Sequence, residues 1–157
     1  MELLEPHIRS GLGVSFMADN DQYWTVWHYY WSDIDNIEAS KATKDRFCVF
    51  EIEKVDDDTI LLKSDWNGKY LSLFYRGNSE SHSIEAGKDQ SDKWCKFKVY
   101  NVDGKIALKS VASGRYLSRF GRSGKGMIEA VKNGIDKYAQ VVNLYKVFDE
   151  NCISDQL

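Results

Sequence analysis

Short hydrophobic runs alternate with polar residues along the chain, and turn-forming residues separate them. The run Ile-Leu-Leu-Lys-Ser at 60–64 is followed by the turn Trp-Asn-Gly at 66–68 and then by Lys-Tyr-Leu-Ser-Leu-Phe at 69–74. Asn-Gly supplies the positive φ angles that a tight turn between two strands requires. Asp-Gly at 103–104 forms another such turn, and Ala-Ser-Gly at 112–114 takes the place of the first one later in the chain. The pattern predicts an all-β chain of short strands.

This strand pattern occurs in three copies. Three markers recur in the same order: Ile-Glu-Ala beginning at 37, 84 and 128, an Asp-led triplet at 45, 92 and 136, and a tyrosine at 23, 70 and 116. The first two markers share spacings of 47 and 44 residues. Each copy, about 46 residues long, is expected to hold about four strands, which gives about twelve in total.

Three four-stranded copies restrict the possible architectures. A β-propeller has a similar period, but propellers have about four to eight blades and carry Gly-His and Trp-Asp marks, which this sequence lacks. We therefore predict a β-trefoil, a closed six-stranded barrel capped by three hairpins. The expected divisions are an N-terminal segment (1–13), a single β-trefoil domain (14–148) and a C-terminal tail (149–157).

Residues that recur in all copies are expected to be structural. Fourth-strand residues Phe50, Phe97 and Val141 should point inward. Cys48 and Cys95 align with Ala139, which indicates small buried hydrophobic residues and not metal ligands or nucleophiles. Two further recurring positions are expected to pack the barrel and its cap: Tyr23, Tyr70 and Tyr116, each with the apolar residue after it, and the aromatic residues Trp27, Phe74 and Phe120.

Charge and targeting features exclude several classes of partner. The 157 residues include 21 basic and 24 acidic side chains, a net charge of −3, which provides no positive field for nucleic acid. The first residues lack the basic and apolar regions of a signal peptide, and no apolar run is long enough to span a bilayer. Three cysteines are an odd number for a disulfide framework. We expect a cytoplasmic protein with no membrane span.

Residues suited to catalysis or metal binding do not gather in the sequence. His7, His28 and His82 are scattered without the spacing of metal ligands, and nucleophile and zinc-protease motifs are absent. We therefore expect no enzymatic activity, no metal and no cofactor.

Aromatic residues make up 13% of the chain, which is the first indication of a binding function. The stretch His-Tyr-Tyr-Trp at 28–31 lies in the hairpin between the second and third strands of the first copy, and the other copies have almost no aromatic counterpart to it. An exposed aromatic cluster marks a site for a partner or ligand. Alternatively, these rings pack against the N-terminal segment or a second subunit.

Two of the copies share a sequence pattern that is also found in known protein families. Ile-Leu-Leu-Lys-Ser at 60–64 and Ile-Ala-Leu-Lys-Ser at 106–110 each lead through a short turn into a basic residue and Tyr-Leu-Ser. The pattern resembles the agglutinin domain of the amaranthin lectins and, more distantly, the fascin-like β-trefoils, over residues 14–148. Asp-Lys-Trp-Cys-Lys-Phe at 92–97 is more similar to the amaranthin pattern.

The amaranthin resemblance implies a non-enzymatic lectin that binds glycans or glycoproteins containing galactose or N-acetylgalactosamine. It also implies a shallow site on the hairpin loops, formed where two trefoils meet. Because this chain has one trefoil, a homodimer would supply the second half of such a site.

The resemblance and the chemistry of sugars together select the candidate site. Phe74, Asn78 and His82 match the family's Trp…Asn-His-Tyr stretch in its second copy. Independently of the family, sugars present apolar C–H faces that stack on aromatic rings, and hydroxyl groups that Asn, Asp and Ser hold in place. The candidate carbohydrate-binding residues are Trp31, Asp65, Trp66, Phe74, Tyr75, Arg76, Asn78 and His82.

The alternative function is that of a fascin-like actin-binding or other protein-interaction β-trefoil. The third copy has a basic hairpin tip that would suit an acidic filament, formed by Arg115, Arg119, Arg122 and Lys125. Filament binding through this tip should weaken steeply as ionic strength rises, whereas stacking of a ring on a sugar should not.

Overall fold

The computed structural model describes residues 13–29, 34–76, 81–120 and 126–147. Within these ranges, an order of three strands, a 3-10 helix and a fourth strand occurs three times. We call these the first, second and third sets. The first set is β1 (Gly13–Met17), β2 (Tyr23–His28), β3 (Asp35–Lys41), η1 (Arg46–Cys48) and β4 (Phe50–Lys54). The second is β5 (Thr59–Ser64), β6 (Tyr70–Arg76), β7 (Ser81–Lys88), η2 (Lys93–Cys95) and β8 (Phe97–Val102), and the third is β9 (Lys105–Ser110), β10 (Tyr116–Phe120), β11 (Met127–Lys132), η4 (Lys137–Ala139) and β12 (Val141–Val147).

Six of the strands pair in a closed ring. β1 pairs with β4, β4 with β5, β5 with β8, β8 with β9, β9 with β12 and β12 with β1, all antiparallel. Closure leaves these strands without an exposed edge, which would otherwise invite pairing with other chains. The expected all-β class is confirmed.

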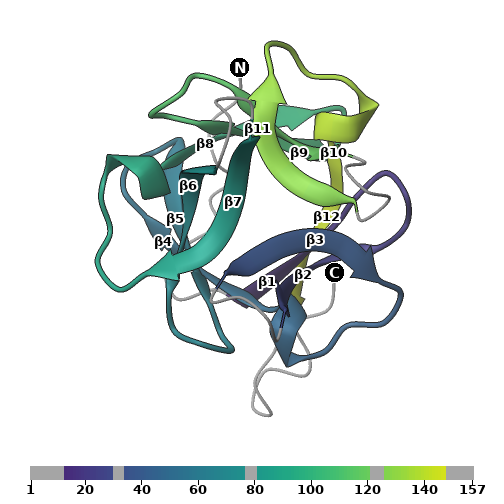
Figure 1. Ribbon diagram of the computed structural model, residues 1–157. Coiled ribbons are helices and arrows are strands. Elements are labelled where there is room, and N and C mark those ends of the chain that lie inside the picture. Colours follow the sequence, from purple (N-terminus) through teal and green to yellow (C-terminus); the bar gives the residue numbers. More distant parts are fainter. Residues whose placement is uncertain (1–12, 30–33, 77–80, 121–125, 148–157) are drawn as a thin grey trace.

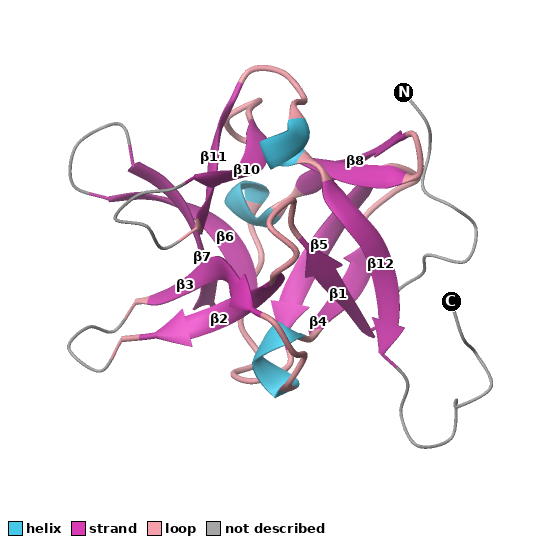
Figure 2. Cartoon of the chain, turned by 90° about the vertical axis from the view of Figure 1, so that its right-hand side faces the viewer, coloured by secondary structure: helices cyan, strands magenta, loops and turns pink. Residues whose placement is uncertain are grey.

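The other six strands form three hairpins, β2–β3, β6–β7 and β10–β11. Their second strands pair with one another, β3 with β7, β7 with β11 and β11 with β3. Figure 1 looks onto the triangle that these three strands form. Figure 2 shows the hairpins on one side of the molecule and strands β1, β4, β8 and β12 on the other. The turns that lead into the hairpins therefore lie where neighbouring sets meet.

Large apolar side chains from the ring of strands fill the core. Phe50 and Phe97 are fully buried and Val141 is almost so, as the sequence predicted. The ring of Phe16 on β1 lies 4.9 Å from that of Trp24 and 6.1 Å from that of Phe50, between ring centroids. Burial of such side chains is the main driving force for folding.

The recurring tyrosines lie at the edge of this core and not inside it. Tyr23, Tyr70 and Tyr116 are only half-buried, and the residue after each one fills the core instead: Trp24, Leu71 and Leu117. The Tyr70 hydroxyl donates a hydrogen bond to the Glu53 carboxylate, at 3.0 Å from Oε2. A tyrosine has an apolar ring and a polar hydroxyl group, so it suits a position between core and solvent. The prediction of fully packed tyrosines is therefore wrong in this respect.

The prediction that Trp27 belongs to the core is also wrong. Trp27 is 41% exposed, because it lies on the opposite face of β2 from Trp24 and Val26, which belong to the core. By contrast, Cys48, Cys95 and Ala139 are buried at matched places, as the sequence predicted. Burial raises the pKa of both thiols, which keeps them protonated and unreactive.

The turn into each hairpin has the backbone conformation that its sequence predicts. Gly68 and Gly114 have φ angles of 70° and 72°, and Asp21 takes the same conformation in the first set, with φ of 61°. One residue before each of them, a side-chain oxygen accepts the backbone N–H two residues further on; these residues are Asn20, Asn67 and Ser113. Asp103 and Gly104 also have positive φ and join β8 to β9, as expected.

Each 3-10 helix begins with an aspartate whose carboxylate is held on two sides. Asp92 accepts the backbone N–H of Trp94 at 2.9 Å and lies 2.7 Å from the Lys88 ammonium. The same arrangement occurs at the start of the other two helices, with Lys41 and Asp45 in the first set and Lys132 and Asp136 in the third. The Asp-led triplet found in the sequence is therefore a helix cap.

Replacing Asp92 with alanine should lower the free energy of unfolding by about 1 kcal/mol near neutral pH, the usual cost of losing an N-cap. The Lys88 ammonium and the Trp94 backbone N–H hold the pKa of this carboxyl below its usual value. Its contribution to stability is therefore present above the pKa of the unfolded chain, about 3.9, and is lost as the pH falls through the lower folded pKa.

Urea unfolding of both proteins at about pH 7 and about pH 2 measures this difference. Asp92→Asn keeps an acceptor at the cap but lacks the charge beside Lys88, so it should recover only part of the loss at about pH 7. A difference that is equally large at the two pH values would contradict the assignment.

Among the described residues, no helix is long and apolar enough to cross a membrane. The same residues contain no group of three His, Cys, Asp or Glu side chains that could hold a metal ion. The predicted limits of the β-trefoil domain stay a prediction, because residues 1–12 and 148–157 lie outside the described ranges.

Candidate functional site

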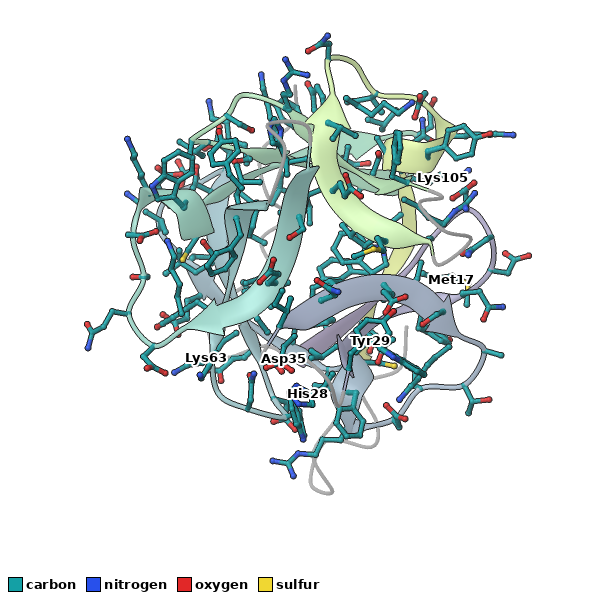
Figure 3. The ribbon with its side chains drawn as sticks, viewed as in Figure 1. Met17, His28, Tyr29, Asp35, Lys63 and Lys105 are labelled. Atoms are coloured by element: carbon teal, nitrogen blue, oxygen red, sulfur yellow. The ribbon has the colours of Figure 1, made fainter. Side chains whose placement is uncertain are left out.

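Aromatic and polar side chains from four elements meet at the junction between the first and second sets. His28 ends β2, Asp35 begins β3, Phe47 is the middle residue of η1, and Trp66 and Asn67 belong to the turn between β5 and β6. We call these five residues the Trp66 site. Figure 3 labels His28 and Asp35, which lie close together beside Tyr29 at the end of the β2–β3 hairpin.

The indole ring of Trp66 lies at the centre of this site. Its centroid is 5.2 Å from that of Phe47 and 6.1 Å from that of the His28 ring, with interplanar angles of 45° and 49°. Trp66 is half-buried and packs against the core on one side. The three rings form an apolar surface of fixed orientation, because each one is attached to a different, hydrogen-bonded element.

A carboxylate lies next to these rings. Asp35 Oδ1 is 2.5 Å from His28 Nδ1, and Asp35 Oδ2 accepts from the Asn67 side-chain amide at 3.4 Å. A carboxylate can accept about four hydrogen bonds, so Asp35 has acceptor positions left for a ligand. Because Nδ1 of His28 faces Asp35, Nε2 is the ring nitrogen that a ligand can reach, and 44% of this side chain is exposed.

Asn67 and Arg46 hold the Trp66 turn in place. The Asn67 amide group donates to the Ala86 carbonyl oxygen at 3.1 Å and its oxygen accepts from the backbone N–H of Lys69 at 3.0 Å. Arg46 Nη2 donates to the carbonyl oxygens of Asp65 and Trp66 at 3.3 and 3.4 Å. Arg46 Nε lies 3.4 Å from Asp65 Oδ2. These contacts fix the indole before any ligand arrives, which lowers the entropic cost of binding.

A second aromatic cluster, the Tyr75 site, lies on the second set. The Tyr75 ring is 54% exposed and makes edge contacts with His82 at 4.7 Å and Trp94 at 5.5 Å, between ring centroids. The His82 ring is fixed in turn, because its Nδ1 lies 3.2 Å from the Ala130 carbonyl oxygen on β11. Trp94 is half-buried and packs against the core.

The Trp66 and Tyr75 sites occupy matched places in two sets. Tyr75 pairs with His82 across β6–β7 in the same register as His28 pairs with Asp35 across β2–β3. Trp94 is the middle residue of η2, as Phe47 is of η1. The same position of the fold therefore presents three aromatic rings twice, and only the first site adds the polar side chains of Asp35 and Asn67.

In the third set, an ion pair occupies the corresponding junction. Arg119 on β10 forms two hydrogen bonds with the Asp19 carboxylate, at 2.7 and 3.0 Å, and its guanidinium lies 5.3 Å from the Tyr138 ring centroid. These contacts raise the pKa of Arg119, chiefly through the hydrogen bonds to Asp19. The interpretation of Arg119 as part of an open basic tip is therefore wrong. Its partners Arg122 and Lys125 lie outside the described residues.

The structure separates the predicted site residues into several places. Trp66 belongs to the Trp66 site, and Tyr75 and His82 belong to the Tyr75 site. Asp65 precedes Trp66 in the same turn, and its carboxylate pairs with Arg46. The Phe74 ring is instead structural, because it lies so close to Gly87 that an added Cβ there would be 3.0 Å from its Cζ. Trp31 and Asn78 lie outside the described residues, and for Arg76 only the backbone, at the end of β6, is described.

Sequence reasoning missed five residues of these two sites: His28, Asp35, Phe47, Asn67 and Trp94. His28 was noted only as part of an aromatic hairpin stretch. Within that stretch, Tyr29 is half-buried, and its hydroxyl donates to Glu38 Oε2 at 2.8 Å. Burial and this hydrogen bond raise the Tyr29 pKa. The hairpin register could have revealed His28 and Asp35, since they align with Tyr75 and His82.

Comparisons with known proteins show the fold. No protein-family model and no curated protein matches the sequence. Three of the solved structures that match are the designed 3-fold symmetric protein ThreeFoil, a lectin of Polyporus squamosus bound to the epitope Neu5Acα2-6Galβ1-4GlcNAc, and the BEL β-trefoil. For ThreeFoil the TM-score is 0.72 and the identity 14%, over 83% of this chain and 96% of that one. For the Polyporus lectin they are 0.73 and 13%, over 88% of this chain and 50% of that one, so this chain spans half of its length. For the BEL β-trefoil they are 0.69 and 14%, over 88% and 94%. At these identities the likeness shows the fold alone, and that fold is a β-trefoil.

Proposed function

We propose that this protein is a non-enzymatic lectin and that the Trp66 site binds its carbohydrate ligand. The observation that carries the proposal is the presence of an ordered indole ring beside an aspartate that is 14% exposed and a half-exposed histidine. A sugar ring needs this combination, because its C–H face stacks on an aromatic ring while its hydroxyl groups exchange hydrogen bonds with carboxylate and imidazole groups. A structural neighbour, the lectin of Polyporus squamosus bound to an oligosaccharide epitope, supports the proposal.

Two finer features of the proposal come from the likeness to the amaranthin-type agglutinins. From this likeness we propose ligands that contain galactose or N-acetylgalactosamine and a homodimer. The cytoplasmic location and the three copies of about 46 residues are proposals from the sequence pattern and not from the likeness. Shallow sugar sites bind with dissociation constants near ~1 mM, about −4 kcal/mol. Two sites on one chain, or two chains in a dimer, would raise the apparent affinity through avidity.

A glycan array with the purified protein tests this function, with free galactose and N-acetylgalactosamine as competitors. We expect binding to a defined class of glycans that the free sugars displace, with little dependence on salt. An array that stays blank at high protein density would refute the lectin function.

Replacing Tyr75 with alanine should weaken binding to a dense glycan surface by about tenfold, because the second aromatic site then no longer adds to avidity. The free energy of unfolding should change by less than about 1 kcal/mol, since the ring is more than half exposed. Surface plasmon resonance at two glycan densities measures the first effect and urea unfolding the second. Unchanged binding at both densities would show that the Tyr75 site takes no part.

No described contact favours the alternative of an actin-binding protein. Of the basic residues that suggested it, Arg119 is neutralised by Asp19. The Arg115 guanidinium donates a hydrogen bond to the Val131 carbonyl oxygen, at 3.4 Å.

A further inference from the structure

A pocket separate from both aromatic sites opens where the second and third sets meet. It has a volume of about 210 Å³ and is lined by residues of β8, of β9 and of the turn after β9: Lys98, Tyr100, Lys109, Ser110, Val111 and Gly114. Pockets that enclose a whole drug-sized ligand have about 300–1,000 Å³. This smaller pocket suits one functional group and the part of a ligand next to it.

Two lysines stand directly opposite each other in this pocket. Lys98 on β8 pairs with Lys109 on β9 across the antiparallel ladder. Like charges in directly opposed positions repel each other and destabilise a strand pair. An anion bound between the two ammonium groups would remove this repulsion.

The matched strand pair β4–β5 has no such repulsion. There Glu51 on β4 stands opposite Lys63 on β5, an opposite-charge pair. Lys63 and Lys109 correspond, because they face Tyr70 and Tyr116 in the same register. Strand β8 thus has a lysine, Lys98, where β4 has a glutamate, and the charge of this position is reversed.

Other acidic groups near strands β4 and β5 are also replaced near β8 and β9. The Tyr70 hydroxyl donates to Glu53 on β4, whereas Tyr116 has the Tyr100 ring of β8 as its neighbour, 5.5 Å away between centroids. Asp65, in the turn after β5, corresponds to Val111 in the turn after β9, and each donates its backbone N–H to the carbonyl oxygen of the residue after a 3-10 helix. The β8–β9 pair and its turn therefore have three carboxylates fewer and one ammonium more than the β4–β5 pair and its turn.

Only one of the two lysines has a carboxylate partner. Asp58 Oδ2 lies 3.9 Å from Lys98 Nζ, a long ion pair without a direct hydrogen bond. In the part of the chain that the structure describes, no carboxylate lies within ion-pairing distance of Lys109, whose ammonium lies 5.4 Å from the Tyr116 ring centroid. Together the pair carries an excess of positive charge at the pocket.

A buried hydroxyl group completes the set of donors. Ser110 is fully buried and lines the pocket, and its oxygen accepts the Ser113 backbone N–H at 3.3 Å. Among the described residues, no acceptor takes the hydrogen of this hydroxyl group. It can donate to a bound oxygen atom.

We propose that this pocket binds the oxyanion of a small ligand, a carboxylate or a sulfate ester, between Lys98 and Lys109. The two ammonium groups and the Ser110 hydroxyl supply the hydrogen bonds, and charge-assisted bonds of this type are stronger than neutral ones. The site is independent of the Trp66 site, so it holds whether or not that site binds sugars.

An NMR titration of the full chain at low ionic strength tests the site. The probes are inorganic sulfate, glucose 6-sulfate, glucuronate and, as the neutral reference, glucose. We expect the three anions, and not glucose, to shift the backbone amide signals of Ser110, Val111 and Gly114. Tighter binding of the sugar anions than of sulfate would assign the pocket to an acidic sugar, and equal binding to a free anion. If no anion shifts these signals, the proposal fails.

Two charge-matched variants separate the pocket from general electrostatics. Lys98→Glu recreates the glutamate–lysine pair of strands β4 and β5 and should weaken anion binding by at least about tenfold. The change removes the repulsion with Lys109 but also breaks the ion pair with Asp58, so the thermal unfolding transition at low salt serves to show that the variant is folded. Lys105→Glu makes the same change of charge at the exposed start of β9 (Figure 3) and should retain binding. Equal losses in both variants would overturn the proposal.

Discussion

Replacing Phe97 with alanine should lower the free energy of unfolding by about 3–5 kcal/mol, the cost of truncating a fully buried phenylalanine. Phe97 begins β8, and no part of it is exposed. It pairs with Ile60 on β5 and with Ser110 on β9, so it lies where the second and third sets join in the closed ring. A cavity at this place would remove contacts from both neighbours at once, and the surrounding strands, fixed by their pairing, can collapse only partly.

Urea unfolding at constant pH measures this loss, and two variants serve as controls. Phe97→Leu leaves most of the apolar volume in place and should cost less than about 1.5 kcal/mol. Tyr138→Ala removes another recurring aromatic ring, but one that is 36% exposed, and should cost about 1 kcal/mol or less. If Phe97→Ala cost no more than Tyr138→Ala, the core would lie elsewhere than the closed ring of strands.

The fold could be predicted because its signals are local and occur several times. Asn67-Gly68 and Asp103-Gly104 mark turns through their own backbone preferences. In the structure, Gly68, Asp103 and Gly104 have positive φ angles. The inward positions of Phe50 and Phe97 follow from the two-residue period of a strand. Recurrence in several copies strengthens each signal, because a misread turn in one copy is corrected by the others.

Burial of aromatic residues was harder to predict, because recurrence alone does not distinguish the core from its edge. Tyr70 recurs as regularly as Leu71, yet its ring is half-buried and its hydroxyl reaches Glu53. Trp27 matches Phe74 in sequence, but only Phe74 is held by a close contact, against Gly87. The difference depends on residues far along the chain that sequence spacing does not place.

The candidate site could be predicted only in part for the same reason. Trp66 was recognised, but its ring neighbours His28 and Phe47 belong to other strands and helices. Asp35 is an ordinary acidic residue in the sequence, and it becomes part of a site only because β3 pairs with β2 and meets the Asn67 turn. Matched positions in the other copies did carry information: comparison of His28 with Tyr75, and of Asp35 with His82, would have selected both.

Replacing Trp66 with alanine should abolish the binding of carbohydrate at the site. Trp66 provides the central ring of the site, and loss of such an anchor weakens binding by about 30-fold or more, about 2 kcal/mol. Since a single shallow site binds near ~1 mM, the loss would take monovalent binding below detection by isothermal titration calorimetry. Trp66→Phe retains a ring on the same turn and should retain part of the affinity.

Two further variants decide how a loss of binding in Trp66→Ala is interpreted. Trp27→Ala removes another indole ring, from β2 and outside the Trp66 site, and should bind as the parent protein does. Asp35→Asn keeps the shape of the site but removes the charge that His28 and Asn67 face, and should weaken binding while Trp66 stays in place. Binding that survives both Trp66→Ala and Asp35→Asn within about threefold would place the ligand elsewhere, since the two variants remove the stacking and the hydrogen-bonding halves of the site separately.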